Sequence, residues 1–167
     1  MRKVLGVASV IVLLVLVTAV PAWPQKDEKD APANLIKAAK FLEEKPFDKD
    51  AKNIRSWAIM WVIETDKVSV TACTLLLSGM DKKYKYRGEI IGKYTIGMAA
   101  FKLANPDKAK DEEAVQLAGV ESALTSYEAM VKEQTKAKDA FLDGLIAKRA
   151  DGSLAKHVAE NNCKSKS

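Results

Sequence analysis

The residues best suited to chemistry are few and scattered in this sequence of 167 residues. The single histidine, His157, forms an H-x-x-E spacing with Glu160, which is half of a helical metal-binding motif. One histidine without a cluster of further ligands is a weak metal or haem site, so we expect a surface histidine here. The sequence therefore predicts no metal ligand and no cofactor.

The hydroxyl and carboxylate patterns typical of enzymes are incomplete as well. Ser153 and Lys156 match the S-x-x-K spacing of serine acyl-transfer enzymes, but the accompanying S-D-N and K-T-G motifs are missing. We therefore expect Ser153 to cap a helix. The pairs Glu43-Glu44 and Glu112-Glu113 suit the solvated faces of amphipathic helices better than glycoside hydrolysis. Since glycine-rich phosphate loops are also missing, we expect no catalytic residue and a protein that is not an enzyme.

The two cysteines, Cys73 and Cys163, leave two alternatives open. Outside the cytoplasm a disulfide between them would persist, and closing a loop of about 90 residues would contribute about 4–5 kcal/mol in the chain-entropy model. Alternatively, Cys73 is a buried free thiol among Ala72, Leu75 and Leu76, and Cys163 is an exposed one. The choice depends on the separation of the two Cα atoms, which a sequence does not give.

The densest basic cluster consists of Lys82, Lys83, Lys85 and Arg87, interleaved with two tyrosines. Cations alternating with aromatic rings are able to hold an anionic surface, such as phospholipid headgroups or a cell-wall polymer. The simpler interpretation, which we favour, is a loop whose tyrosines pack while its lysines stay hydrated.

Four aromatic residues, Trp57, Trp61, Tyr94 and Phe101, are candidates for lining a ligand cleft between helices. Aromatic side chains at helical spacing more often form the core, and we favour that interpretation.

The first 22 residues have the tripartite pattern of a signal peptide. Arg2 and Lys3 precede an uncharged apolar run over residues 4–20, and Val20-Pro21-Ala22 provides small residues for cleavage after Ala22. Cleavage after Ala19 is the second choice, and retention of the run as a single membrane anchor is the alternative. The remainder of the chain is therefore expected outside the cytoplasm, in the periplasm or the medium.

Charge and length limit the function further. The formal net charge of +5 falls to +3 when Arg2 and Lys3 are removed with residues 1–22, and so small a charge predicts no nucleic-acid partner. With 48% apolar residues, the chain is long enough for one core, and we expect a single domain over residues 33–162.

Apolar periodicity predicts an all-α fold of six or seven amphipathic helices. Short connections indicate either an antiparallel bundle or an irregular array of helical hairpins. A polar linker over 23–32 precedes the domain, and a disordered tail over 163–167 follows it. The first expected helix begins near Pro32 and ends before Pro46, and Leu35, Ala38, Ala39 and Leu42 mark one face of it. The others cover 49–65, 70–78, 86–104, 109–132 and 135–149, and a short one follows Ser153. We expect Thr135 to cap the helix over 135–149, Asp151-Gly152 to end it, and Gly97 to allow close approach of a neighbouring helix.

For two of these helices the sequence makes more specific predictions. The helix over 49–65, with Asp48 as its N-cap, is apolar nearly all round, which predicts a central position. Residues 66–80 alternate like a strand around Val68 and Val70, but a lone strand leaves its backbone groups unpaired. We therefore predict a short connector and a helix over 70–78 that ends at Gly79.

The sequence predicts an exported helical protein with a small net charge and without a recognisable set of catalytic residues. These features together favour a non-catalytic module that binds a protein or peptide in the cell envelope. The first alternative is a carrier of a small molecule or lipid in a pocket between helices. An enzyme of unrecognised type is the second. Membrane contact is expected only through an uncleaved N-terminal segment, and the oligomeric state stays open.

Overall fold

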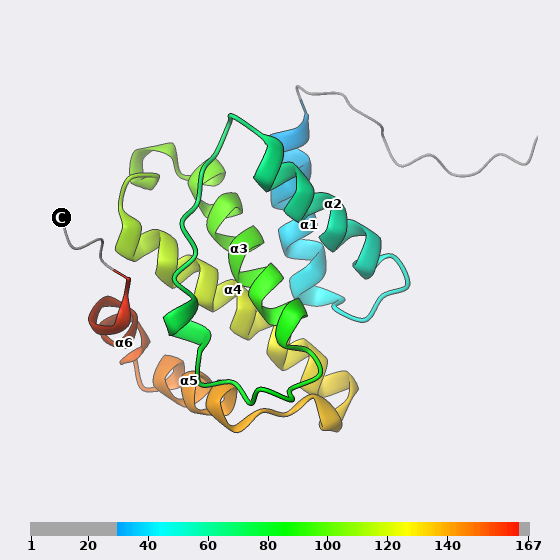
Figure 1. Cartoon of the computed structure of the whole chain (residues 1–167), viewed down its shortest axis with the longest axis vertical. Coiled ribbons are helices and arrows are strands. Elements are labelled where there is room, and N and C mark those ends of the chain that lie inside the picture. The colour runs from blue at the N-terminus through cyan, green and yellow to red at the C-terminus, as the bar shows by residue number, and fades with distance from the viewer. Residues whose placement is uncertain (1–29, 164–167) are drawn as a thin grey trace, which may run out of the picture.

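A computed structural model describes residues 30–163, and the regular elements in this range are all helices, without a strand (Figure 1). The predicted all-α class is therefore confirmed. The predicted signal peptide, residues 23–29 of the linker and residues 164–167 of the tail lie outside the described range. The α-helices within it are α1 (Ala31–Glu44), α2 (Ala51–Glu64), α3 (Arg87–Ala104), α4 (Glu112–Glu133), α5 (Ala140–Ala150) and α6 (Leu154–Asn161).

The antiparallel pair of α3 and α4 forms the centre of the molecule (Figure 1). Two glycines allow this pair to approach closely. A Cβ atom on Gly97 would collide with the side chain of Ser122, and one on Gly119 would lie 2.7 Å from the ring of Tyr94. The predicted role of Gly97, close approach of a neighbouring helix, is confirmed.

Two hydrophobic clusters flank this central pair. Helices α1 and α2 pack on one side of α3, where Leu35 and Leu42 are buried against Ile96. Helices α5 and α6 pack on the other side, and Leu145 and Val158 are buried there. The buried face of α1 is the predicted one, at residues 35, 38, 39 and 42.

The prediction of a central position for α2 is wrong. One side of this helix is buried through Ile54, Ala58 and Val62, which contact α1 and α3. The opposite side carries Trp57, Met60 and Ile63, which are 39%, 52% and 71% exposed. Periodicity identified the apolar residues correctly, but no other described element covers this second side of the helix.

The predicted helix over 70–78 is also wrong. Residues 65–73 have no regular structure, and only a short 3₁₀ turn follows at Thr74–Leu77. Side chains of α3 and α4 satisfy the exposed backbone groups of this segment instead of a second strand. The hydroxyl of Tyr94 accepts from the Cys73 N–H at 3.1 Å, the amide of Gln116 donates to the Thr71 carbonyl at 2.7 Å, and Lys102 donates to the Ser69 carbonyl at 2.9 Å.

Three helix starts differ from their predicted caps. Helix α2 begins after Asp50, and the carboxylate of Asp48 accepts from the N–H of Asp50 at 2.9 Å. Thr135 begins a 3₁₀ turn, Thr135–Ala137, whereas Asp139 caps α5 by accepting from the N–H groups of Phe141 and Leu142 at 3.0 and 3.1 Å. Ser153 stands at the N-cap position of α6, but its side chain makes no capping hydrogen bond.

The end of α5 follows the prediction. Gly152 has φ +78°, a left-handed conformation that favours glycine. The Ser153 N–H donates to the Lys148 carbonyl at 2.9 Å and the Gly152 N–H to the Arg149 carbonyl at 3.3 Å. This is a Schellman motif, so Asp151-Gly152 ends the helix as expected.

Candidate functional site

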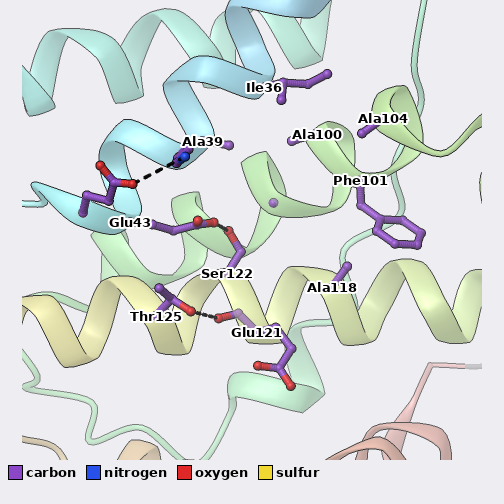
Figure 2. Close-up of a pocket in the computed structure, with 13 residues that line it drawn as sticks. Ile36, Ala39, Glu43, Ala100, Phe101, Ala104, Ala118, Glu121, Ser122 and Thr125 are labelled. Atoms are coloured by element: carbon purple, nitrogen blue, oxygen red, sulfur yellow. Dashed lines mark hydrogen bonds and ion pairs between the residues drawn. The ribbon is translucent and has the colours of Figure 1, made fainter.

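An open groove lies where α1, α3 and α4 meet, and its volume is about 530 Å³ (Figure 2). Each helix contributes about two turns to it, which corresponds to a length of about 11 Å. The residues that line it are Ile36, Ala39, Lys40, Glu43 and Glu44 of α1, Gly97, Ala100, Phe101 and Ala104 of α3, and Ala118, Glu121, Ser122 and Thr125 of α4.

Small side chains create this groove. Ala39, Gly97, Ala100 and Ala118 come from three helices, and none reaches far enough to fill the space between them. Charged and hydroxyl side chains surround this apolar floor, and they include three glutamates and a single lysine. The groove therefore combines an apolar surface with a polar rim, whose glutamates Glu43, Glu44 and Glu121 pair with Lys93, Lys40 and Arg149.

A buried lysine beneath the groove ties the three helices together. Lys93 of α3 is 2% exposed, and its ammonium group donates to the Ala39 carbonyl at 2.6 Å and pairs with the Glu43 carboxylate at 3.1 Å. The same carboxylate accepts a hydrogen bond from the Ser122 hydroxyl of α4, as Figure 2 shows. Glu43 thus connects α1 to both central helices.

Burial lowers the pKa of Lys93 from 10.5 to about 8, although the Glu43 carboxylate and its hydrogen bond partly offset this effect by favouring the charged form. The lysine is therefore mostly charged at pH 7 and mostly neutral at pH 9. Among residues 30–163, Glu43 is the acidic residue that pairs with Lys93.

The stability of the fold should accordingly increase as the pH rises from 7 to 10. In this window the unfolded chain holds a proton on Lys93 that the folded protein has lost, so deprotonation favours folding. The pKa difference predicts a gain of about 2–3 kcal/mol in the free energy of unfolding. Urea unfolding followed by tryptophan fluorescence at several pH values measures this slope.

The Lys93→Met variant is the control, since it should remove the increase. Above pH 10 the opposite trend is expected, because burial raises the pKa of Tyr94 to about 12 and the unfolded chain then loses its phenol proton first. An equal slope for the wild type and Lys93→Met between pH 7 and 10 would contradict this assignment.

The two cysteines form a disulfide in the structure, and their Cα atoms lie 5.3 Å apart. Cys73 is buried at the start of the 3₁₀ turn, where Tyr94 contacts its backbone. Cys163 was expected in a disordered tail, but the bridge holds this residue against the segment that precedes α3. Of the two alternatives left open, the structure has the bridged one.

The basic cluster at 82–87 lies in the connection that leads into α3. Lys82, Lys83 and Lys85 are exposed, whereas Arg87 donates to the Met80 carbonyl at 2.9 Å. The two tyrosines between them point inward, and Tyr84 donates to the Ala137 carbonyl at 2.7 Å. The exposed part of the cluster is therefore three lysines.

The four candidate aromatic residues lie in different parts of the molecule. Trp57 is on the exposed side of α2, and Trp61 packs against the cluster formed with α1. Tyr94 is fully buried between α3 and α4, where it hydrogen-bonds to Gln116. Only Phe101 lines the groove, at its rim.

His157 lies on α6 with its Nδ1 atom 3.3 Å from the Asn161 side chain. Lys156 pairs with Glu160 at 3.8 Å rather than with Ser153. Residues 30–163 contain no group of three or more histidine, cysteine or acidic side chains arranged to hold a metal ion. Nor does any helix in this range have the length and hydropathy of a membrane span.

Sequence reasoning missed both Lys93 and the groove. A signal for Lys93 existed, because this charged residue lies between Ile90 and Ile96, which are both fully buried on the same helix. The groove left only a weak signal. Its alanines and glycine predict close helix packing as well as they predict a groove. Only the relative positions of the three helices distinguish the two.

Such a groove can accept apolar side chains of another molecule on its floor and hold hydrogen-bonding groups at its rim. Comparison of the chain with protein-family models, with curated proteins and with solved structures finds no match.

Proposed function

We propose that this protein is an exported, non-catalytic helical module that binds a segment of a protein or peptide in the cell envelope. The observation that carries this proposal is the open groove between α1, α3 and α4. An amphipathic helix that lays its apolar side into a groove is a common mode of peptide recognition. The floor of alanines and glycine suits this mode, because a partner backbone can approach it closely.

The dimensions of the groove favour a segment over a compact small molecule. Two turns of each lining helix offer a surface about as long as two turns of a bound helix. The rim glutamates already have cationic partners, since Glu43 pairs with Lys93, Glu44 with Lys40 and Glu121 with Arg149. The apolar floor, rather than the charge of the rim, therefore favours a segment with an apolar side.

The location rests on the N-terminal sequence. The positive residues Arg2 and Lys3, the apolar run and the small residues before Trp23 support a signal peptide over 1–22 and delivery to the periplasm or the medium. Retention of this segment would place the same domain at the outer surface of the membrane. Helices α1 to α6 support an irregular array of three helical hairpins as the finer description of the fold.

A groove-filling substitution tests the proposal. Ala118→Phe places an aromatic ring above the floor from a half-exposed position on α4. We expect it to reduce capture of a specific envelope protein by at least tenfold, because the ring occupies the space that the partner would fill. The measurement is quantitative mass spectrometry of proteins retained from envelope extract by the wild type and by the variant.

Ala147→Phe is the matched control, since Ala147 is exposed on α5 and does not line the groove. It should retain the partner as the wild type does. Equal retention by all three proteins would contradict binding in the groove. A small molecule or lipid that leaves with the wild type and not with Ala118→Phe would instead support the carrier alternative.

A further inference from the structure

Two connections lie side by side at one end of the molecule and bring separate groups of lysines together (Figure 1). One connection leads into α3, and the other runs from α4 to α5. The Tyr84 hydroxyl of the first donates to the Ala137 carbonyl of the second at 2.7 Å. Five exposed lysines lie within two positions of these two residues, and we call them the five-lysine surface: Lys82, Lys83, Lys85, Lys136 and Lys138.

The fold assembles this surface from distant parts of the chain. Tyr84 and Ala137 are 53 positions apart, and beside them the Tyr86 hydroxyl donates to the Gln134 side chain at 3.1 Å. Because α3 and α4 are antiparallel, the start of α3 lies beside the end of α4, and both groups of lysines come to the same end. The lysines that precede α3 are therefore only part of a larger basic surface.

The charge of the five-lysine surface is not balanced by its surroundings. None of its ammonium groups forms an ion pair within residues 30–163. Residues 81–87 and 132–139 contain seven lysines and arginines against three acidic residues, whereas residues 30–163 as a whole contain 21 against 20. The rest of the described chain is therefore net negative, and the positive charge is concentrated at this end.

The side chains of this end indicate what kind of anion it fits. The two tyrosines between the lysines are turned inward by their hydrogen bonds, so they are not available to stack on nucleic-acid bases. Lysine is a hydrated point charge on a flexible stem, and none of the five lysines lines the groove. This surface therefore suits a layer of distributed negative charge better than a partner of one defined shape.

We propose that the five-lysine surface binds the anionic headgroups of a phospholipid membrane. Clustered lysines are attracted to such a surface because their individual interactions with it add up. The proposal extends the membrane contact expected from the sequence, which involved only the N-terminal segment. It does not depend on what the groove binds, since the two sites share no residue.

Co-sedimentation of the full chain with lipid vesicles tests this proposal. The wild type should bind vesicles of phosphatidylglycerol and phosphatidylcholine more tightly than vesicles of phosphatidylcholine alone. This difference should decrease when the ionic strength is raised, because salt screens exposed charges. The segments outside residues 30–163 carry lysines of their own, but they are the same in every variant and contribute equally.

Two double variants test whether both connections take part. Lys82→Gln with Lys83→Gln, and Lys136→Gln with Lys138→Gln, should each reduce binding to the anionic vesicles roughly tenfold or more. Combining all four changes should reduce it further. All four side chains are exposed and without ion pairs in the described chain, so the fold should tolerate the changes, and circular dichroism verifies this.

Lys108→Gln with Lys110→Gln is the matched control. These two lysines are exposed in the connection between α3 and α4, at the opposite end of that helix pair (Figure 1). The control removes the same charge and should bind the anionic vesicles as the wild type does.

Three results would overturn the proposal. The first is equal binding of the wild type to anionic and neutral vesicles. The second is an equal effect of the control pair and of the two pairs in the five-lysine surface. The third is binding of soluble polyglutamate or polyphosphate without binding to anionic vesicles, which would assign the surface to a soluble acidic partner instead.

Discussion

The Cys163→Ser variant is expected to lower the free energy of unfolding by about 4–5 kcal/mol. The bridge joins residues 90 positions apart, and opening it releases the unfolded chain from a long closed loop. Cys163 is exposed, so serine at this position introduces no buried polar group, and the remaining thiol of Cys73 is tolerated in its apolar surroundings. Urea unfolding under oxidising conditions measures the loss.

Reduction of the wild type provides an independent test of the same bridge. A thiol reductant should lower the stability of the wild type to that of Cys163→Ser and leave the variant unaffected. The denatured, unreduced wild type should also contain no titratable thiol. Two thiols per chain, or a wild type that is insensitive to reductant, would show that the bridge is not formed in solution.

The second large effect is expected at the lysine beneath the groove. Glu43→Gln removes the charge that faces Lys93 and leaves a buried ammonium group without its anionic partner. Removing one member of a buried ion pair typically costs 3–5 kcal/mol, and we expect a loss of about 3 kcal/mol at pH 7 because Glu43 is 26% exposed. Denaturant unfolding at pH 7 gives this value.

Lys93→Met separates the charge effect from packing. Methionine fills a similar space without a charge, and the Glu43 carboxylate that it leaves unpaired is 26% exposed and open to water, so this variant should cost less than Glu43→Gln. Adding Glu43→Gln to Lys93→Met should then cost far less than in the wild type. The cost in the wild type should also decrease by pH 10, where Lys93 is neutral. Equal costs in both backgrounds would mean that the pair contributes nothing by its charge.

The helices were predictable because their signal is local. In α1 the spacing of Leu35 and Leu42 identified the buried face, and Asp151-Gly152 fixed the end of α5. These features depend only on residues within one or two turns, and a single sequence contains all of them.

The errors concern groups whose partners are distant in the sequence. Residues 65–73 remain extended because Tyr94, Lys102 and Gln116 satisfy their backbone groups, and these side chains are 21 to 45 positions away. Helix α2 illustrates the reverse case. Its apolar residues were identified correctly, but composition alone does not show whether another element covers them.

The candidate site could not be predicted from the sequence for the same reason. Its floor consists of small residues from α1, α3 and α4, and each of these residues looks like ordinary packing in its own helix. Only Lys93 stood out, as a charge within a buried helix face, and its partners Ala39 and Glu43 are about 50 positions earlier. A cysteine pairing was foreseen as one of two options, because only two thiols exist.

The disulfide also determines how the molecule responds to a pulling force. It closes residues 73–163 into a covalent ring that contains α3 to α6, whereas α1 and α2 lie outside the ring. Tension applied between Asp30 and Cys163 can therefore extend only residues 30–73, to about 150 Å, instead of the roughly 450 Å of the reduced chain. Under load the α1–α2 hairpin is the part that can lengthen, and the rest remains mechanically shielded.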